Sequence, residues 1–230
     1  SGLAAGSTDL SISNVETLRM DNVGTNGALQ MDNLAVTSMR FDSGAASTET
    51  ITLTDIASTI NTFSFLGAGT ADADLLFDAV TFDYDVTATQ AAATITVNNG
   101  GATADDISIG KLDMNRIEAI TITATEIGAA AADQLTIAEI EADHTTDIVV
   151  SANGELVLSD LDTALLDTLD LSAADDGATV TNLRLYADAL TVTMGDGNDV
   201  VISTENNNAA TMTIDLGTGK TAVQLVAGYE

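Results

Sequence analysis

The stretch Leu156-Val157-Leu158-Ser159-Asp160-Leu161 decides the fold. It reads as an apolar residue, any residue, an apolar residue, any residue, an acid or amide, and a third apolar residue. Side chains alternate between the two faces of a strand, so the first two apolar residues point to the same side. Asn and Asp suit a corner at the fifth place because they tolerate the left-handed backbone conformation. Each copy is therefore interpreted as a short strand, a corner, and three residues directed at a core.

The same order recurs upstream, in copies that begin at Leu10, Leu29, Ile51, Leu75, Ile107 and Leu135, with 19 to 32 residues between successive starts. A second apolar pair follows several copies, at Phe63/Phe65, Ile120/Ile122, Ile148/Val150 and Leu169/Leu171. We interpret this pair as the next strand of the same turn of chain. A unit of this length cannot bury its apolar face alone, so neighbouring units are expected to stack and share a continuous core.

The repeat predicts an all-β protein, a parallel β-solenoid (β-helix or β-roll) with irregular rungs. The alternative is an antiparallel β-sandwich, which the uneven spacing favours. Only three short stretches suit a helix, 114–119, 126–134 and 160–167. We expect one domain over residues 1–230, as a fragment or mature form of a longer surface protein. The residues expected to be buried in one core, stacked in register, are Leu10, Ile12, Leu29, Met31, Ile51, Leu53, Ile107, Ile109, Leu135, Ile137, Leu156 and Leu158.

The charge of the chain limits its partners. Six Lys and Arg stand against 35 Asp and Glu, for a formal net charge of −29, whereas 45% of the residues are hydrophobic. That hydrophobic content predicts a folded chain rather than a disordered one. Nucleic acid is not expected as a partner, because phosphate binding needs clustered cations. No apolar run approaches the roughly 18 residues of a membrane span, so no membrane insertion is expected.

One motif near the C-terminus carries chemistry, Met194-Gly195-Asp196-Gly197-Asn198-Asp199-Val200-Val201. The calcium-binding nonapeptide of parallel β-rolls is G-G-x-G-x-D-x-U-x. Gly195, Gly197 and Asp199 match its second, fourth and sixth places, Val201 matches the apolar place, and Met194 replaces the first glycine. Carboxylate and carbonyl oxygens are the ligands that Ca²⁺ prefers. The candidate metal site is Gly195, Asp196, Gly197, Asn198 and Asp199, with Ca²⁺ as the cofactor. The alternative is a tight turn whose acids face solvent.

With this motif, the chain resembles the repeats-in-toxin family and, within it, bacterial surface-layer (S-layer) proteins exported by type I secretion. The form "apolar-Glu-x-apolar-x-apolar" around Glu16 and Glu118, and the Ala/Thr/Asp/Gly-rich, Cys-free composition, are similar to that family. The resemblance implies a secreted, calcium-stabilised β-solenoid that assembles with copies of itself at the bacterial cell surface. Only one good nonapeptide is present, and Leu216–Thr221 keeps the glycine spacing with Thr221 in the aspartate place.

Catalysis is not expected. His144 is the single histidine, Cys is absent, and no G-x-S-x-G elbow occurs. The function expected is a self-assembling structural subunit of a surface layer or extracellular fibre, a homo-oligomer in a lattice or filament. The alternative is an extracellular adhesin module that binds glycan or another cell, and a cell-surface polysaccharide is a further candidate partner. A polysaccharide lyase on a β-helix is the remote alternative, since six scattered cations do not form a basic cleft.

Overall fold

The fold comes from a computed structural model, which describes residues 15–21, 29–31, 34–42, 49–57, 59–67, 75–84, 90–98, 106–125, 134–174, 176–185, 189–206 and 211–225. All regular structure in this part of the chain is β-strand. Within it, no helix is long and apolar enough to cross a membrane. The stretches at 114–119 and 160–167, considered as helices, form turns and strand segments instead, while 126–133 lies outside the described residues.

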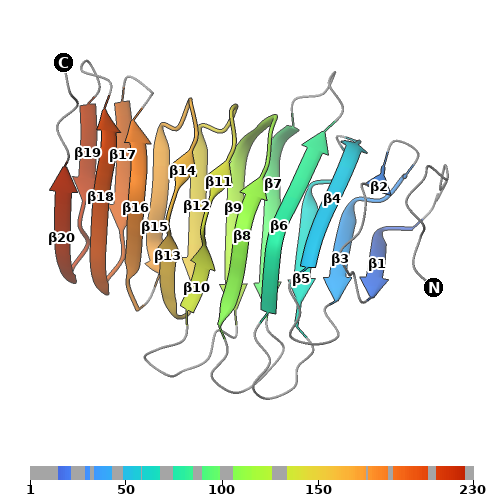
Figure 1. Ribbon diagram of the computed structural model, residues 1–230, viewed down its shortest axis with the longest axis horizontal. Coiled ribbons are helices and arrows are strands. Elements are labelled where there is room, and N and C mark those ends of the chain that lie inside the picture. Colours follow the sequence, from blue (N-terminus) through green and yellow to red (C-terminus); the bar gives the residue numbers. More distant parts are fainter. Residues whose placement is uncertain are drawn as a thin grey trace.

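The strands form two sheets that face each other (Figure 1). The nine-stranded sheet contains, in spatial order, β1 (Thr17–Asp21), β3 (Ser38–Asp42), β5 (Thr62–Leu66), β7 (Gln90–Asn98), β9 (Ile117–Thr125), β12 (Asp147–Ala152), β15 (Thr168–Ala174), β17 (Ala189–Met194) and β19 (Thr211–Asp215). The eleven-stranded sheet contains β2 (Leu29–Gln30), β4 (Glu49–Ile56), β6 (Leu75–Tyr84), β8 (Ile107–Asp113), β10 (Gln134–Ile137), β11 (Ile140–Glu141), β13 (Glu155–Leu158), β14 (Leu161–Asp162), β16 (Ala178–Leu185), β18 (Asn198–Asn206) and β20 (Lys220–Leu225).

The chain winds as a parallel β-solenoid. It passes back and forth between the two sheets, and every strand pairing recorded between neighbours is parallel. Neighbouring strands are therefore successive turns of one coil, as the stacked order in Figure 1 shows. The predicted solenoid is confirmed, and an antiparallel sandwich is not what the chain forms.

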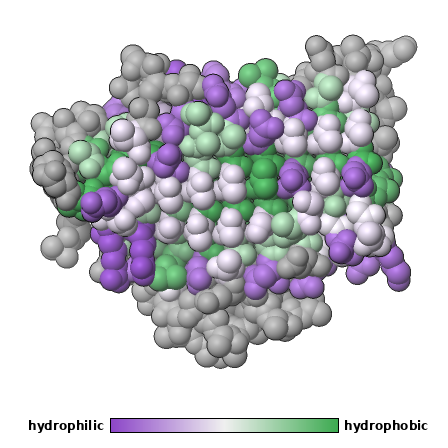
Figure 2. Space-filling model, turned by 180° about the vertical axis from the view of Figure 1, so that it is seen from behind, coloured by the Kyte–Doolittle hydropathy of each residue, from purple (hydrophilic) through white to green (hydrophobic). Residues whose placement is uncertain are grey.

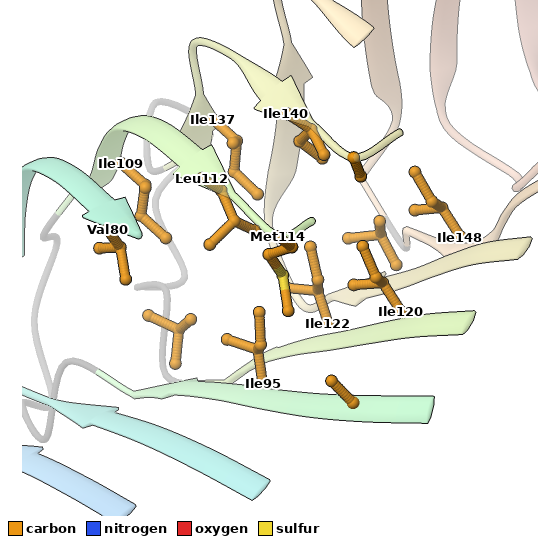
Figure 3. Close-up of a cluster of buried hydrophobic side chains, with 14 of the residues drawn as sticks. Val80, Ile95, Ile109, Leu112, Met114, Ile120, Ile122, Ile137, Ile140 and Ile148 are labelled. Carbon is orange, nitrogen blue, oxygen red and sulfur yellow. The ribbon is translucent and has the colours of Figure 1, made fainter. Parts of the chain in front are cut away.

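The core is a single apolar cluster between the two sheets. The first, third and sixth repeat positions fill it from the eleven-stranded sheet, and the second apolar pairs fill it from the nine-stranded sheet. Figure 3 shows the two sets meeting, with Ile109, Leu112 and Ile137 opposite Ile95 and Ile122. Of the predicted core positions, Met31, Ile51, Leu53, Ile107, Ile109, Leu135, Ile137, Leu156 and Leu158 are at most 2% exposed. Leu10 and Ile12 lie outside the described residues, as does the side chain of Leu29.

The predicted register holds in the middle of the stack. Leu135 pairs with both Ile107 and Leu156, and Ile137 with both Ile109 and Leu158. Buried β-branched and Leu side chains at equal positions can stack on one another, so each turn specifies the register of the next.

The register prediction is wrong toward the N-terminus. Ile51 pairs with Val80 rather than Leu75, and Leu29 pairs with Leu53 rather than Ile51. The pairing of β4 with β6 contains two irregularities. Residues 75–81 of β6 pair with β8, and residues 77–84 pair with β4. Val15, expected to point inward, is 38% exposed.

An eighth copy of the repeat was missed in the sequence. Ala178-Thr179-Val180-Thr181-Asn182-Leu183 continues the column above Leu156 and Leu158, and its three apolar side chains are fully buried. The small first residue hides the pattern. Asn182 takes a φ of 51° and Asp55, at the same place in an earlier copy, a φ of 54°. These two corners adopt the left-handed conformation that the repeat predicts.

Candidate functional site

The candidate metal-binding turn joins β17 to β18 and lies within a column of three turns. Gly195–Asp199 connects the two sheets, the turn ending at Gly177 precedes it in the stack, and the turn containing Gly217 and Gly219 follows it. The backbone N–H of Lys220 donates a hydrogen bond of 3.1 Å to the carbonyl of Gly197, which joins the second and third turns of this column.

Glycine is required in this column because the turns approach backbone to backbone. A Cβ on Gly197 would collide with the backbone of Gly177, and a Cβ on Gly219 would collide with the carbonyl of Gly197. Gly177 also has a φ of 115°, a conformation that residues with a side chain rarely adopt. The glycine spacing read in 195–197 and 217–219 therefore reflects the close stacking of these turns.

Asp199 is the most unusual residue of the site. It is 1% exposed, and its Oδ1 accepts a hydrogen bond of 2.9 Å from the backbone N–H of Ala178. Its other oxygen, Oδ2, is buried without a hydrogen-bond partner. Because Val200 pairs with Thr179, Asp199 lies level with Ala178, at the first apolar position of the repeat. A carboxylate has thus replaced an apolar residue in a core-facing column.

The other predicted ligands surround this carboxylate on the outside of the turn. Asp196 is exposed, and its Oδ1 accepts a hydrogen bond of 2.6 Å from the hydroxyl of Thr218 in the next turn. Asn198 is also exposed and pairs with Lys220 of the neighbouring strand. The structure brings the five predicted residues together as one turn, but it separates their side chains, with Asp199 inside and Asp196 and Asn198 outside.

The donor set suits a hard cation in part. The free oxygen of Asp199 and the glycine carbonyls of the stacked turns are the oxygen types that Ca²⁺ takes. A buried ionised group without a partner is costly, and a bound cation satisfies it. However, the described residues contain no group of three or more His, Cys, Asp or Glu arranged to hold a metal. Asp199, with backbone carbonyls, would therefore supply the protein's share of such a site.

A second charged feature lies on the outside of the eleven-stranded sheet, where Asp113, Glu141 and Asp162 lie at equal positions on successive turns. Lys111 forms ion pairs with Glu139 and Glu141. Further along the stack, Arg184 bonds to Asp160 and Asp162, each at 3.1 Å.

These carboxylates influence one another. Burial and, to a smaller degree, the nearby Glu141 carboxylate raise the pKa of Asp113. The hydrogen bond to Glu141 raises the pKa of Lys111, so this ammonium stays charged beside the acids. The aligned carboxylates are partly neutralised by Lys111 and Arg184. These two of the six basic residues therefore have a structural role.

His144 is exposed on the turn between β11 and β12. Comparisons of the chain with protein-family models, with curated proteins and with solved structures gave no match.

Sequence reasoning located the turn but missed two features of it. The inward direction of Asp199 depends on the register between β16 and β18, which no copy of the repeat marked, because Asp occupies the apolar place. The contact between Thr218 and Asp196 was signalled by the matching glycine spacing of the two turns, 22 residues apart.

Proposed function

We propose that the protein is a self-assembling structural subunit of an extracellular bacterial surface layer or fibre, and that Ca²⁺ at the Gly195–Asp199 turn stabilises it. One observation carries the proposal: buried core positions recur on successive turns from Met31 to Val201. Such a stack is a rigid body whose surfaces are its functional parts.

The buried oxygen of Asp199 supports the calcium part of the proposal. An apolar residue at this place would continue the column of Leu156 and Ala178, so the carboxylate costs stability unless something binds it. The glycines around it bring carbonyl oxygens of neighbouring turns close together. A cation here would fix three consecutive turns and remove a buried charge.

The charge supports a role for cations in assembly. Copies with a net charge of −29 repel one another, and 0.15 M salt screens this repulsion only beyond about 8 Å. Contact between copies therefore needs divalent ions at acidic positions or surfaces that lack carboxylates. The extracellular medium would supply the divalent ions.

The experiment is negative-stain electron microscopy of the purified chain at rising concentration, in millimolar Ca²⁺ and in EDTA. The proposal expects sheets or filaments in Ca²⁺ that disperse in EDTA. Single particles in both conditions at every concentration would contradict self-assembly. If those single particles bind cells or glycans, the adhesin alternative takes its place.

A further inference from the structure

The outer face of the nine-stranded sheet carries long rows of hydroxyl side chains. Two rows run across the strands in register. We call the outer side of β1, β3, β5, β7, β9 and β12 the hydroxyl face. The first row contains Thr17, Ser38, Thr62, Thr94 and Thr121. The second row contains Ser64, Thr96, Thr123 and Ser151. Figure 2 looks onto this sheet and shows near-white residues in rows across its middle, with hydrophobic residues between them and most of the hydrophilic residues toward the ends and margins.

Charge is nearly absent from the centre of this face. In β5, β7 and β9 the only charged residue is Glu118, near the start of its strand. At the β1 end, Arg19 and Arg40 both form ion pairs with Asp42, at 2.6 Å each, so the carboxylate neutralises one of the two positive charges. The opposite sheet carries the aligned carboxylates of Asp113, Glu141 and Asp162.

We propose that two copies of the chain pair through their hydroxyl faces. This inference rests on the proposed function, since it names the surface by which copies associate. A molecule with 35 carboxylates and six cations meets its own copy with least repulsion where carboxylates are absent. The centre of the hydroxyl face is such a surface, because β5, β7 and β9 contain one charged residue between them.

Hydroxyl groups also make the face complementary to itself. Each Thr or Ser hydroxyl donates one hydrogen bond and accepts others, so a row of them can bond to an identical row. A contact between two identical patches is the two-fold type that is commonest among homo-oligomers. Thr17 and Ser38 form a hydrogen bond across neighbouring strands, Oγ1 to Oγ at 2.7 Å, so hydroxyls of one row lie within hydrogen-bonding distance of each other.

The size of the face fits a modest but specific contact. Six strands spaced about 4.8 Å apart and five residues of about 3.3 Å each give a face of roughly 500 Å². Two copies would bury roughly 1,000 Å² in total, at the lower limit of specific interfaces. A pair held by this contact is a building block that other contacts, such as cation-bridged acids, extend into a larger assembly.

The test uses matched double variants of the whole chain in sedimentation velocity and electron microscopy. Ser64→Glu/Thr121→Glu places two charges on the hydroxyl face, on strands separated by β7. Thr52→Glu/Thr136→Glu places the same charge on outward positions of the opposite sheet and is the control. We expect the face variant to raise the concentration needed for pairing at least about tenfold, because it buries unpaired charges, and the control to pair like the wild type. Circular dichroism melting checks that all variants fold.

A variant of opposite charge separates a contact from a change in net charge. Ser64→Lys/Thr121→Lys makes the molecule less negative, yet it also places unpaired charge between the faces. Weaker pairing in both the Glu and the Lys variants supports the proposal, whereas weakening in the Glu variant alone overturns it.

A cross-link gives an independent measurement, because the chain has no Cys. Thr96→Cys, near the centre of the face, is expected to form a disulfide-linked dimer under mild oxidation, and Thr136→Cys is not. Equal cross-linking of the two overturns the proposal. If the wild type assembles and the face variants assemble equally well, the hydroxyl face is wrong and the proposed function stands. If the wild type stays monomeric under every condition, both fail.

Discussion

Asp199 offers the sharpest test of the calcium site, because the effect of Asp199→Asn on thermal stability should reverse when calcium is added. Asn keeps the oxygen that accepts the hydrogen bond from Ala178, and it removes the negative charge from the buried position. A buried group without its partner costs about 1–3 kcal/mol, and a charged group costs more. In EDTA, Asp199→Asn should therefore be at least as stable as the wild type.

In Ca²⁺ the wild type should be more stable than Asp199→Asn. A ligand that binds only the folded state stabilises it by about 2.7 kcal/mol at 100 times its Kd. For a chain of this size, each kcal/mol changes the melting temperature by about 2–4 °C. The wild type should therefore melt about 5–11 °C higher in Ca²⁺ than in EDTA, and most of that difference should disappear in Asp199→Asn.

The assay is thermal melting by circular dichroism, with and without Ca²⁺, on the wild type, Asp199→Asn and Asp143→Asn. Asp143 is exposed on a distant turn, so its variant removes the same charge without touching the site. A wild type that melts identically in Ca²⁺ and EDTA would refute the reasoning. So would an Asp199→Asn variant that keeps the full calcium response, since the ion would then be bound elsewhere.

Three further predictions concern the scaffold. Leu158→Ala empties a fully buried position and should cost about 2–5 kcal/mol of unfolding free energy, whereas Leu165→Ala, at a residue 49% exposed, should cost far less in the same chemical denaturation experiment. His144→Ala, on an exposed turn, should change stability by no more than about 0.5 kcal/mol and leave assembly intact, and a loss of assembly would reveal a site at this turn. Burial, with Glu141, raises the pKa of Asp113, so the folded state binds this proton more tightly than the unfolded state and the charged form destabilises the fold. Asp113→Asn should therefore raise the melting temperature at pH 7, and the difference from the wild type should shrink as the pH falls through the raised pKa. A difference in melting temperature that does not change with pH would contradict this cause.

The sequence predicted the fold well where the core dominates. Positions such as Leu135 and Leu156 are apolar in most turns, and the alternation around them distinguishes inward from outward residues without further information. The pattern failed where a side chain of a different kind occupies a core position. Ala178 is too small to mark a copy, and Asp199 is polar, so the continuation of the Leu135 and Leu156 column into these two turns was not visible.

Register was harder to predict than the fold itself. In the turns that contain Ile51 and Leu75, several apolar residues follow one another at two-residue spacing, and any of them fits the core. Which ones pair depends on the two irregularities between β4 and β6, one of which contains the left-handed corner at Asp55. The candidate site was found by its glycines, whose requirement is steric, but the direction of each acid depended on register and was not predictable.

Parallel stacking also explains why the two faces of the solenoid differ in what they can do. In a parallel stack, equal positions of successive turns align at a spacing of about 4.8 Å, so any outward residue type that recurs becomes a row. Carboxylates in a row repel one another. Burial is the main cause of the raised pKa of Asp113, and the neighbouring Glu141 carboxylate adds a smaller part. Lys111 and Arg184 form ion pairs with members of this row and offset part of the repulsion. A row of hydroxyls carries no such cost and extends across several strands without counter-charges. On the proposal made above, the hydroxyl face is the surface that pairs with a copy of the chain, and we expect the acidic row to respond to pH because burial raises the pKa of Asp113.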